Sequence, residues 1–440
     1  MTLTLDAIRA CFEGVIPGIM STAGADGVPN VSHLSHVQFI DGEHVALTYQ
    51  FLNKTRQNIL ANPRAVLAVI DPLTAAHYRL AIEYRRTESA GPLFESMKAR
   101  LAGIASHVGM EGVFRLLGAD VYRVTGIEQV PGETIGAPPA CRNRLAALRA
   151  VSERIRHKYD LDLLLTETLA ALETELDIGH AMVLLYDGNE GRLYTVASLG
   201  YDASGIGSEI RFGEGVIGVA ARERTPIRIS HMVSEYGYNR AIRDNAAPGE
   251  AGSEIPFPGL AGSRSQLAVP LLAGPRMIGV LYVESPLELR FSYDDEDMLV
   301  ALGAQLALSI DILRTLDDDI ALPDAITLAP AAAGEPLLVR HFPENDSVFL
   351  GDDYLIKGVA GSIFAVLARD FAEKGRTEFT NRELRLDPRI RLPDISDNLE
   401  GRLLLLSRRL DERKAGVHIE KTGRGRFRLC ADRPLQLADA

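Results

Sequence analysis

Apolar and polar residues alternate in several short runs within the first 130 residues, which is the pattern that half-buried strands produce. Residues 45–49 and 78–84 show this alternation most clearly. The continuous apolar run at residues 65–70 predicts a further strand, buried on both faces. Because strands dominate and helices are few, the pattern predicts a β-barrel over residues 1–130.

A mixed pattern follows between residues 145 and 316. Leucines recur at helical spacing over residues 145–176, and paired apolar runs between residues 181 and 285 predict strands. The segment FSYDDEDMLVALGAQLALSIDIL begins with acidic residues, which favour the start of a helix, and continues at helical spacing. We therefore expect an α/β domain over residues 145–316.

The last hundred residues predict three helices and a hairpin. Helical spacing covers residues 355–371 and 396–414, and Thr380 with Glu383 forms a capping box that opens a helix between them. Residues 417–429 predict two strands joined by a glycine-containing turn. This order is typical of a winged helix-turn-helix, which we expect within residues 338–440.

Two stretches rich in proline, glycine and alanine separate these blocks, at residues 131–143 and 317–336. The 440-residue chain has 46% hydrophobic and 24% charged residues, as soluble globular proteins do. It has no apolar run long enough to span a membrane and no secretory signal pattern. Three widely separated cysteines allow no CxxC pair and no disulfide framework. We expect a cytoplasmic protein without membrane contact or a metal site.

Charge is distributed unevenly along the chain. The net charge is −12, yet residues 340–440 carry 19 basic and 17 acidic side chains, and residues 402–433 carry 10 and 4. A basic segment on an acidic body suggests a module that binds a polyanion. A solvated charged surface would explain the same numbers.

The segments GVPNVSHLSHV and HVALTYQFLNKTRQNILANPRAVLAVI resemble the split barrel of the pyridoxamine 5'-phosphate oxidase-like family. The resemblance implies an FMN cofactor, whose phosphate would lie at the short helix that ends at Asn62-Pro63. The family has three basic phosphate contacts at these positions. Ser32 and Thr55 replace two of them here, and Lys54 keeps the third. The family's late Arg and Trp substrate contacts have no match, so pyridoxamine phosphate oxidation itself is not implied. The expected cofactor residues are Ser32, Tyr49, Gln50, Asn53, Lys54, Thr55 and Arg56. Lys54 and Arg56 could instead be solvated residues at a helix start.

The segments GEGVIG, SQLAVPLL and IGVLYVES resemble the GAF domain family over residues 158–314. The resemblance implies a small-molecule sensor whose ligand the sequence does not identify. A polar loop supplies candidate ligand contacts that could equally cap the domain, namely His231, Tyr236, Tyr238 and Asn239. A leucine stripe predicts either a dimer seam or internal packing, at Leu299, Leu302, Leu306, Leu313 and Leu316.

The segments NRELRLD, DNLEGRLLLLSRRLDERK and VHIEKTGRGRFRL resemble the winged-helix output domain of response regulators. The resemblance implies duplex DNA as the partner, although a winged helix can also bind protein. Arg402, Arg409 and Arg413 fall on one side of the third helix at 3.6 residues per turn, and Arg424 and Arg426 lie on the wing.

The fold class expected from these patterns is multidomain α+β, with a split β-barrel, a GAF α/β sensor and a winged helix in that order. The preferred function is a homodimeric, FMN-binding, one-component transcription regulator. The alternative is an FMN-dependent oxidoreductase in which the other two domains serve assembly or control.

Overall fold

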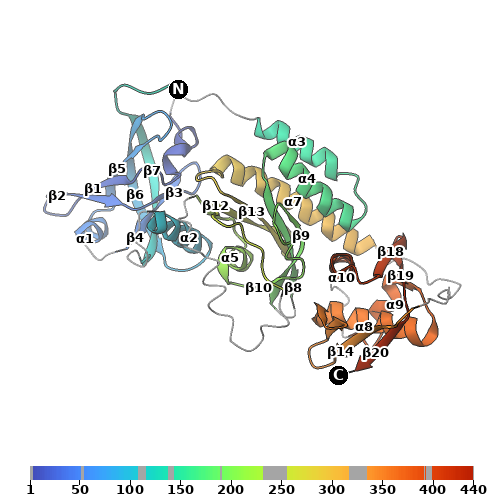
Figure 1. Ribbon diagram of the computed structural model, residues 1–440. Helices are drawn as coiled ribbons and strands as arrows, with labels where there is room; N and C mark the ends of the chain where they lie inside the picture. Colours follow the sequence, from blue (N-terminus) through green and yellow to red (C-terminus); the bar gives the residue numbers. More distant parts are fainter. Residues whose placement is uncertain are drawn as a thin grey trace.

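The structure, a computed structural model, describes residues 3–50, 54–107, 115–136, 143–188, 191–230, 255–316, 334–390, 392 and 399–439. The chain forms three parts that follow one another along the molecule (Figure 1). We call them the N-terminal barrel (residues 3–136), the middle domain (143–316) and the C-terminal domain (334–439). No helix in these ranges is long and apolar enough to cross a membrane.

The N-terminal barrel is built on one curved, antiparallel seven-stranded sheet with the order β2-β1-β5-β6-β7-β4-β3. A short 3-10 helix, η1, precedes the sheet, and helices α1 and α2 lie against it. The elements are η1 (Asp6–Phe12), β1 (Gly18–Ala23), β2 (Pro29–Leu34), β3 (Val37–Phe39), β4 (His44–Tyr49), α1 (Lys54–Ala61), β5 (Arg64–Ile70), β6 (His77–Glu88), α2 (Pro92–His107) and β7 (Gly118–Gln129).

In the strands whose sequence alternates, every second side chain points into the barrel. Leu80 and Ile82 of β6 are buried in the barrel core, and Arg79 and Ala81, which alternate with them, are exposed. The prediction for residues 65–70 is wrong in one respect. Val66 of β5 is 44% exposed, so this strand of an antiparallel sheet is fully buried on one face only.

The middle domain is a six-stranded antiparallel sheet with the order β10-β9-β8-β13-β12-β11. Helices α3, α4 and α7 cover one face and α5 lies on the other (Figure 1). The elements are α3 (Arg144–Ile155), α4 (Leu161–Leu176), β8 (His180–Asp187), β9 (Arg192–Leu199), β10 (Glu209–Arg211), α5 (Gly215–Glu223), β11 (Ile227–Ile229), β12 (Ser265–Ala273), β13 (Arg276–Ser285) and α7 (Tyr293–Leu316).

Helix α7 does not present its leucine stripe to a partner. Leu299, Leu302, Leu306 and Leu313 are buried in the core of this chain, so the structure favours internal packing over the dimer seam for these residues. A different set of apolar side chains on α7 faces solvent. Val300 is 39%, Leu308 53% and Ile312 56% exposed.

The C-terminal domain contains the predicted helices and hairpin together with a sheet that the sequence did not reveal. A four-stranded sheet, β16-β15-β14-β20, has β20 parallel to β14, although the two strands lie about a hundred residues apart. A three-stranded sheet, β17-β19-β18, holds the hairpin. The elements are β14 (Leu337–Phe342), β15 (Ser347–Leu350), β16 (Asp353–Ile356), α8 (Gly358–Lys374), β17 (Glu378–Thr380), α9 (Asn381–Leu386), α10 (Leu399–Arg413), β18 (Val417–Gly423), β19 (Arg426–Ala431) and β20 (Leu435–Asp439).

Of the capping box predicted at the start of α9, the described residues show the bond made by the N-cap threonine. The Thr380 hydroxyl accepts a hydrogen bond from the Glu383 backbone N–H at 3.2 Å. The start of α7 is acidic as expected, with Asp294, Asp295 and Glu296 in its first turn.

The N-terminal barrel and the middle domain meet around Tyr293. This residue begins α7, yet its side chain packs in the barrel core. Its hydroxyl accepts hydrogen bonds from the Phe39 N–H at 3.2 Å and from the Arg100 guanidinium at 2.8 Å. Arg228 of β11 lies over its ring at 4.3 Å and forms ion pairs with Glu13 at 2.6 Å and Glu296 at 2.7 Å.

Candidate cofactor pocket and basic helix

A cavity of about 80 Å³ opens in the wall of the N-terminal barrel between β2, β4 and α1. It brings together Ser32, Tyr49, Gln50, Thr55 and Arg56, five of the residues that the sequence assigned to a cofactor. Lys54 is exposed and does not line the cavity, and Asn53 lies outside the described residues. The remaining lining residues are Met20, His33, Leu34, Ser35, Leu47, Thr48, Ile59, Asp120 and Tyr122.

Hydroxyl groups gather at one end of this cavity, where α1 begins beside β2. Ser32 and Thr55 are hydrogen-bonded through their hydroxyls, and the Asn30 amide donates to the Thr55 hydroxyl at 2.8 Å. These small polar side chains occupy the space that larger basic residues would fill. The end of the cavity is therefore polar but carries little positive charge of its own.

Arg56 supplies the positive charge of the cavity, and its position is fixed from three directions. Its guanidinium donates to the Asp120 carboxylate at 2.6 Å and to the Thr87 hydroxyl at 2.9 Å, and it lies 4.5 Å from the centre of the Tyr49 ring. Burial raises the pKa of Asp120, although Thr87 and Arg56 act in the opposite direction. The pKa of Arg56 is raised by Asp120 even though burial opposes this, so the guanidinium stays charged.

Gln50 contributes an acceptor to which no described residue donates. Its amide N–H donates to the Ser35 hydroxyl at 2.7 Å, and its Oε1 is buried without a hydrogen-bond partner among the described residues. A buried carbonyl oxygen in this state costs about 1–3 kcal/mol. A bound molecule with an N–H or O–H group at this position would recover that energy.

The sequence missed Asp120, Tyr122, Thr87 and His33 as neighbours of this cavity. Asp120 and Tyr122 lie on β7, more than sixty residues from Arg56, and only the pairing of β7 with β4 and β6 brings them there. His33 follows Ser32 on β2. Neighbouring residues of a strand point to opposite faces, so the sequence gave no sign that both line the cavity.

Two of the predicted DNA contacts are not on the surface. Arg402 and Arg409 of α10 are each only 6% exposed. Arg402 is paired with Asp187 of β8 and lies 4.5 Å from the centre of the Tyr194 ring. Arg409 donates to the Leu355 carbonyl at 3.2 Å and pairs with Glu412 at 2.6 Å. The prediction of one exposed arginine face is therefore wrong for this arrangement, because α10 has apolar residues on two sides and is covered on both.

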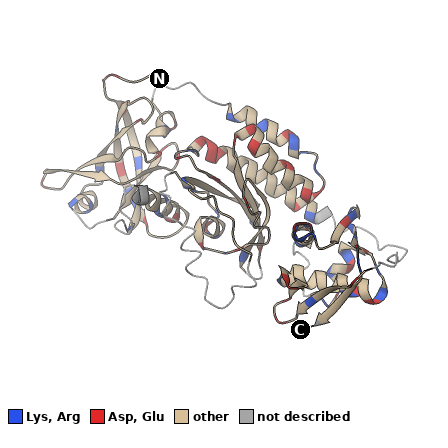
Figure 2. Ribbon diagram, viewed as in Figure 1, with Lys and Arg blue, Asp and Glu red and all other residues tan. Residues whose placement is uncertain are grey.

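Arg413, Arg424 and Arg426, the other three predicted DNA contacts, are exposed. Lys and Arg residues recur over the helices and strands of the C-terminal domain, and Asp and Glu residues recur along α4 of the middle domain (Figure 2). The predicted sensor contacts His231, Tyr236, Tyr238 and Asn239 lie outside the described residues.

Comparisons with protein families agree with two of the three resemblances. Residues 4–125 match the family model described as pyridoxamine 5'-phosphate oxidase, and residues 160–310 match the GAF domain model. The chain therefore carries a domain similar to pyridoxamine 5'-phosphate oxidase, followed by a GAF domain. An uncharacterized protein of Methanocaldococcus jannaschii is 42% identical over 67 residues, or 15% of this chain. The chain spans 44% of the length of this curated relative.

Solved structures resemble single parts of the chain. The GAF domain of the Acinetobacter phosphoenolpyruvate-protein phosphotransferase is 20% identical, with a TM-score of 0.32, over 39% of this chain and 96% of that one. Free methionine-R-sulfoxide reductase from Neisseria meningitidis is 22% identical, with a TM-score of 0.32, over 39% and 91%. An FMN-binding protein from Syntrophomonas wolfei is 17% identical, with a TM-score of 0.25, over 29% and 86%. Similarities of this size carry no functional information.

Proposed function

We propose that this protein is a cytoplasmic flavin-binding sensor that regulates transcription through a winged-helix C-terminal domain. The observation that carries the proposal is the barrel cavity. Tyr49, Gln50, Thr55 and Arg56 line it together with Ser32, although they come from β2, from the end of β4 and the residue after it, and from α1. The match of residues 4–125 to the pyridoxamine 5'-phosphate oxidase model supports FMN as the ligand.

The residues of the cavity suit the phosphate end of FMN better than the ring system. One water needs roughly 10–15 Å³ of such space, so about 80 Å³ admits a phosphate group but not a three-ring flavin. Two hydroxyls and the Arg56 guanidinium offer donors to a phosphate. Tyr49, which also lines the cavity, would offer an aromatic face to the rest of the cofactor. A second subunit that covers the mouth of the cavity would complete the site, which is why we propose a homodimer.

The chain's own residues would hold and orient the cofactor. Arg56 would share its guanidinium between Asp120 and the phosphate, while Asp120 and Thr87 keep it in place. The unpartnered Gln50 oxygen would accept a hydrogen bond from the ligand. FMN itself would supply one- or two-electron chemistry, which makes redox state a natural input signal.

The proposed output is DNA binding by the C-terminal domain. Three helices precede the β18–β19 hairpin, and exposed arginines lie at the end of α10 and on the hairpin. A helix of this kind enters the major groove while the hairpin contacts the backbone. The alternative, an FMN-dependent oxidoreductase with two regulatory domains, would use the same barrel cavity without any DNA partner.

The cofactor proposal is tested by the visible absorption spectrum of the purified full-length protein and by titration with FMN. We expect the paired substitution Arg56→Gln with Asp120→Asn to weaken FMN binding by about 1.5–3 kcal/mol, the value of a charge-assisted hydrogen bond. Changing both residues avoids leaving a buried carboxylate unpaired. Arg64→Gln removes an exposed arginine of β5 that does not line the cavity and serves as the control. No flavin in the protein and no response to added FMN would refute the cofactor assignment.

A further inference from the structure

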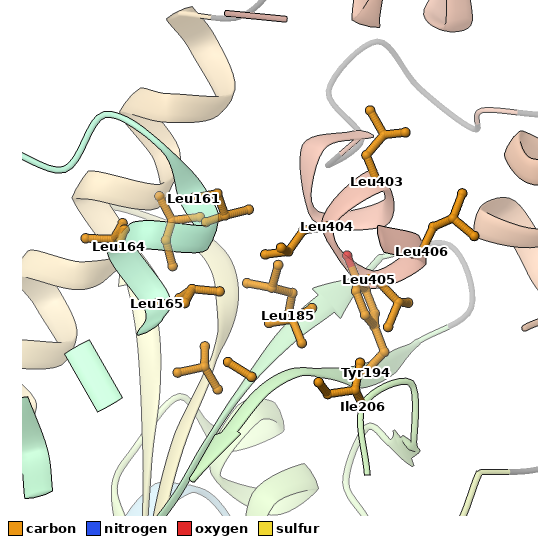
Figure 3. Close-up of a cluster of buried hydrophobic side chains, with 14 of the residues drawn as sticks. Leu161, Leu164, Leu165, Leu185, Tyr194, Ile206, Leu403, Leu404, Leu405 and Leu406 are labelled. Carbon is orange, nitrogen blue, oxygen red and sulfur yellow. The ribbon is translucent and has the colours of Figure 1, made fainter. Parts of the chain in front are cut away.

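Helix α10, which the proposed function assigns to DNA, is packed against the middle domain. Figure 3 shows Leu404 and Leu405 pointing toward middle-domain residues that include Leu165, Leu185 and Tyr194. Leu403 and Leu406 lie on the other sides of the helix. Leu404 is 7% and Leu405 4% exposed, so this side of α10 is closed to solvent.

Ion pairs between the two domains surround these leucines, and in each pair named below the cation comes from the same domain. The C-terminal domain supplies the cations and the middle domain supplies the anions. Arg402 is paired with Asp187, Arg408 with Asp162, and Lys421 of the hairpin with Asp160. Arg408 also donates to the Val196 carbonyl at 2.6 Å.

A DNA-binding helix and wing would offer such cations to phosphate groups, which are also anionic oxygen acceptors. In this structure, three aspartates of the middle domain accept from them instead. We infer that the middle domain weakens DNA binding by the C-terminal domain, because it covers α10 and places Asp160, Asp162 and Asp187 against cations that would otherwise contact phosphates. The inference rests on the proposed DNA-binding function and names how that site is regulated.

The ion pairs between α10, the hairpin and the middle domain are weak enough for the two domains to separate reversibly. The Lys421 and Asp160 side chains are 51% and 26% exposed, and those of Arg408 and Asp162 are 17% and 48% exposed. A cavity of about 330 Å³ lies between α4, α10 and the hairpin, and both of these pairs line it. Water can reach such pairs, and partly exposed ion pairs stabilise a structure only weakly. The buried Arg402–Asp187 pair and the leucines stabilise the contact further. The open state, in which α10 is free of the middle domain, would then be a minor population that a signal could increase.

The test uses full-length protein carrying Asp160→Asn and Asp162→Asn together. Asp160 caps α4 by accepting from the Leu163 N–H at 3.0 Å, and asparagine caps helices equally well, so the fold of α4 is retained. The control is Glu128→Gln with Glu133→Gln, which changes the net charge by the same amount at exposed positions of the N-terminal barrel. The two measurements are affinity for a random-sequence duplex at low salt and the radius of gyration from small-angle scattering.

We expect the aspartate variant to bind duplex about two- to thirty-fold more tightly than the wild type and to have a larger radius of gyration, while the control matches the wild type. The range follows from two ion pairs of roughly 0.2–1 kcal/mol each, because apparent affinity scales with the open fraction. Equal duplex binding by the wild type and the variant would overturn the inference and leave the proposed DNA-binding function intact. An expanded variant that binds no duplex would instead overturn the DNA-binding function, and with it the meaning assigned to the contact.

Discussion

The contact between the N-terminal barrel and the middle domain should depend on a single arginine. Arg228 has a fully buried side chain that pairs with Glu13 of the barrel and with Glu296 of α7. It also donates to the Phe291 carbonyl at 2.8 Å. The perturbation is Arg228→Leu, which keeps an apolar side chain in the space over Tyr293 but removes these hydrogen bonds and a fourth, to the Ser230 hydroxyl at 3.3 Å.

The expected cost follows from what the leucine would leave behind. Glu13 would keep one contact, from the Tyr293 N–H at 2.9 Å, and Glu296 would keep Arg100 at 3.3 Å. Both carboxylates would nevertheless lose their closest cation in a largely buried setting. Removing one partner of a buried ion pair costs about 3–5 kcal/mol, and we expect a destabilisation in that range.

The assay is equilibrium urea unfolding followed by circular dichroism, with hydrogen exchange used to locate the loss. Because a chain with several domains need not unfold in one step, the midpoint of the first transition is the quantity to compare. Exchange should increase in η1, β11 and the first turn of α7, and remain unchanged in the C-terminal domain.

Arg264→Leu is the matched control, since Arg264 is 52% exposed and pairs with Glu288 at 3.3 Å. An exposed pair of this kind contributes about 0–1 kcal/mol. If Arg228→Leu were no more destabilising than Arg264→Leu, the central role of Arg228 in joining the two domains would be wrong.

Two further predictions concern acid stability and assembly. The pKa of Asp370 is lowered from its ordinary value of 3.8, because Arg389 and Lys374 outweigh the effect of burial. The stability that it contributes is therefore present above that value and is lost as the pH falls below it. Asp370→Asn should weaken the acid dependence of the C-terminal unfolding midpoint between pH ~5 and ~2, and an unchanged acid dependence would contradict this. For assembly, we expect Leu308→Glu with Ile312→Glu to weaken the dimer in sedimentation velocity, because these exposed side chains form an apolar surface on α7 that would be a second contact beside the barrel. Leu287→Glu, at a position 62% exposed outside α7, is the control, and a wild-type monomer at micromolar concentration would refute the dimer itself.

Periodicity was enough to predict most of the individual elements. The alternation in β6, the leucine spacing in α4 and α7, and the capping box of α9 depend on neighbours in sequence, so the pattern alone locates them. The segments that resemble known families pointed to the barrel cavity, and five of the seven assigned residues line it.

Periodicity also shows that a side chain is buried but not which surface buries it. Leu299 and Leu302 fit a dimer seam as well as an internal core, and only the packing of α7 on its own sheet decided between them. The same ambiguity affected α10, where Arg402 and Arg409 share a helix side with leucines that contact another domain.

The sequence by itself determined the local elements, the order of the three blocks and the residue types available at each candidate site. The tertiary structure decided which charges meet. Arg56 pairs with Asp120, Arg228 with Glu13 and Arg402 with Asp187, and these partners lie 64, 215 and 215 positions apart in the sequence. Ion pairs act through space over a few ångströms, whereas helical and strand periodicities extend over only a few residues of sequence, so no local pattern could reveal these partners.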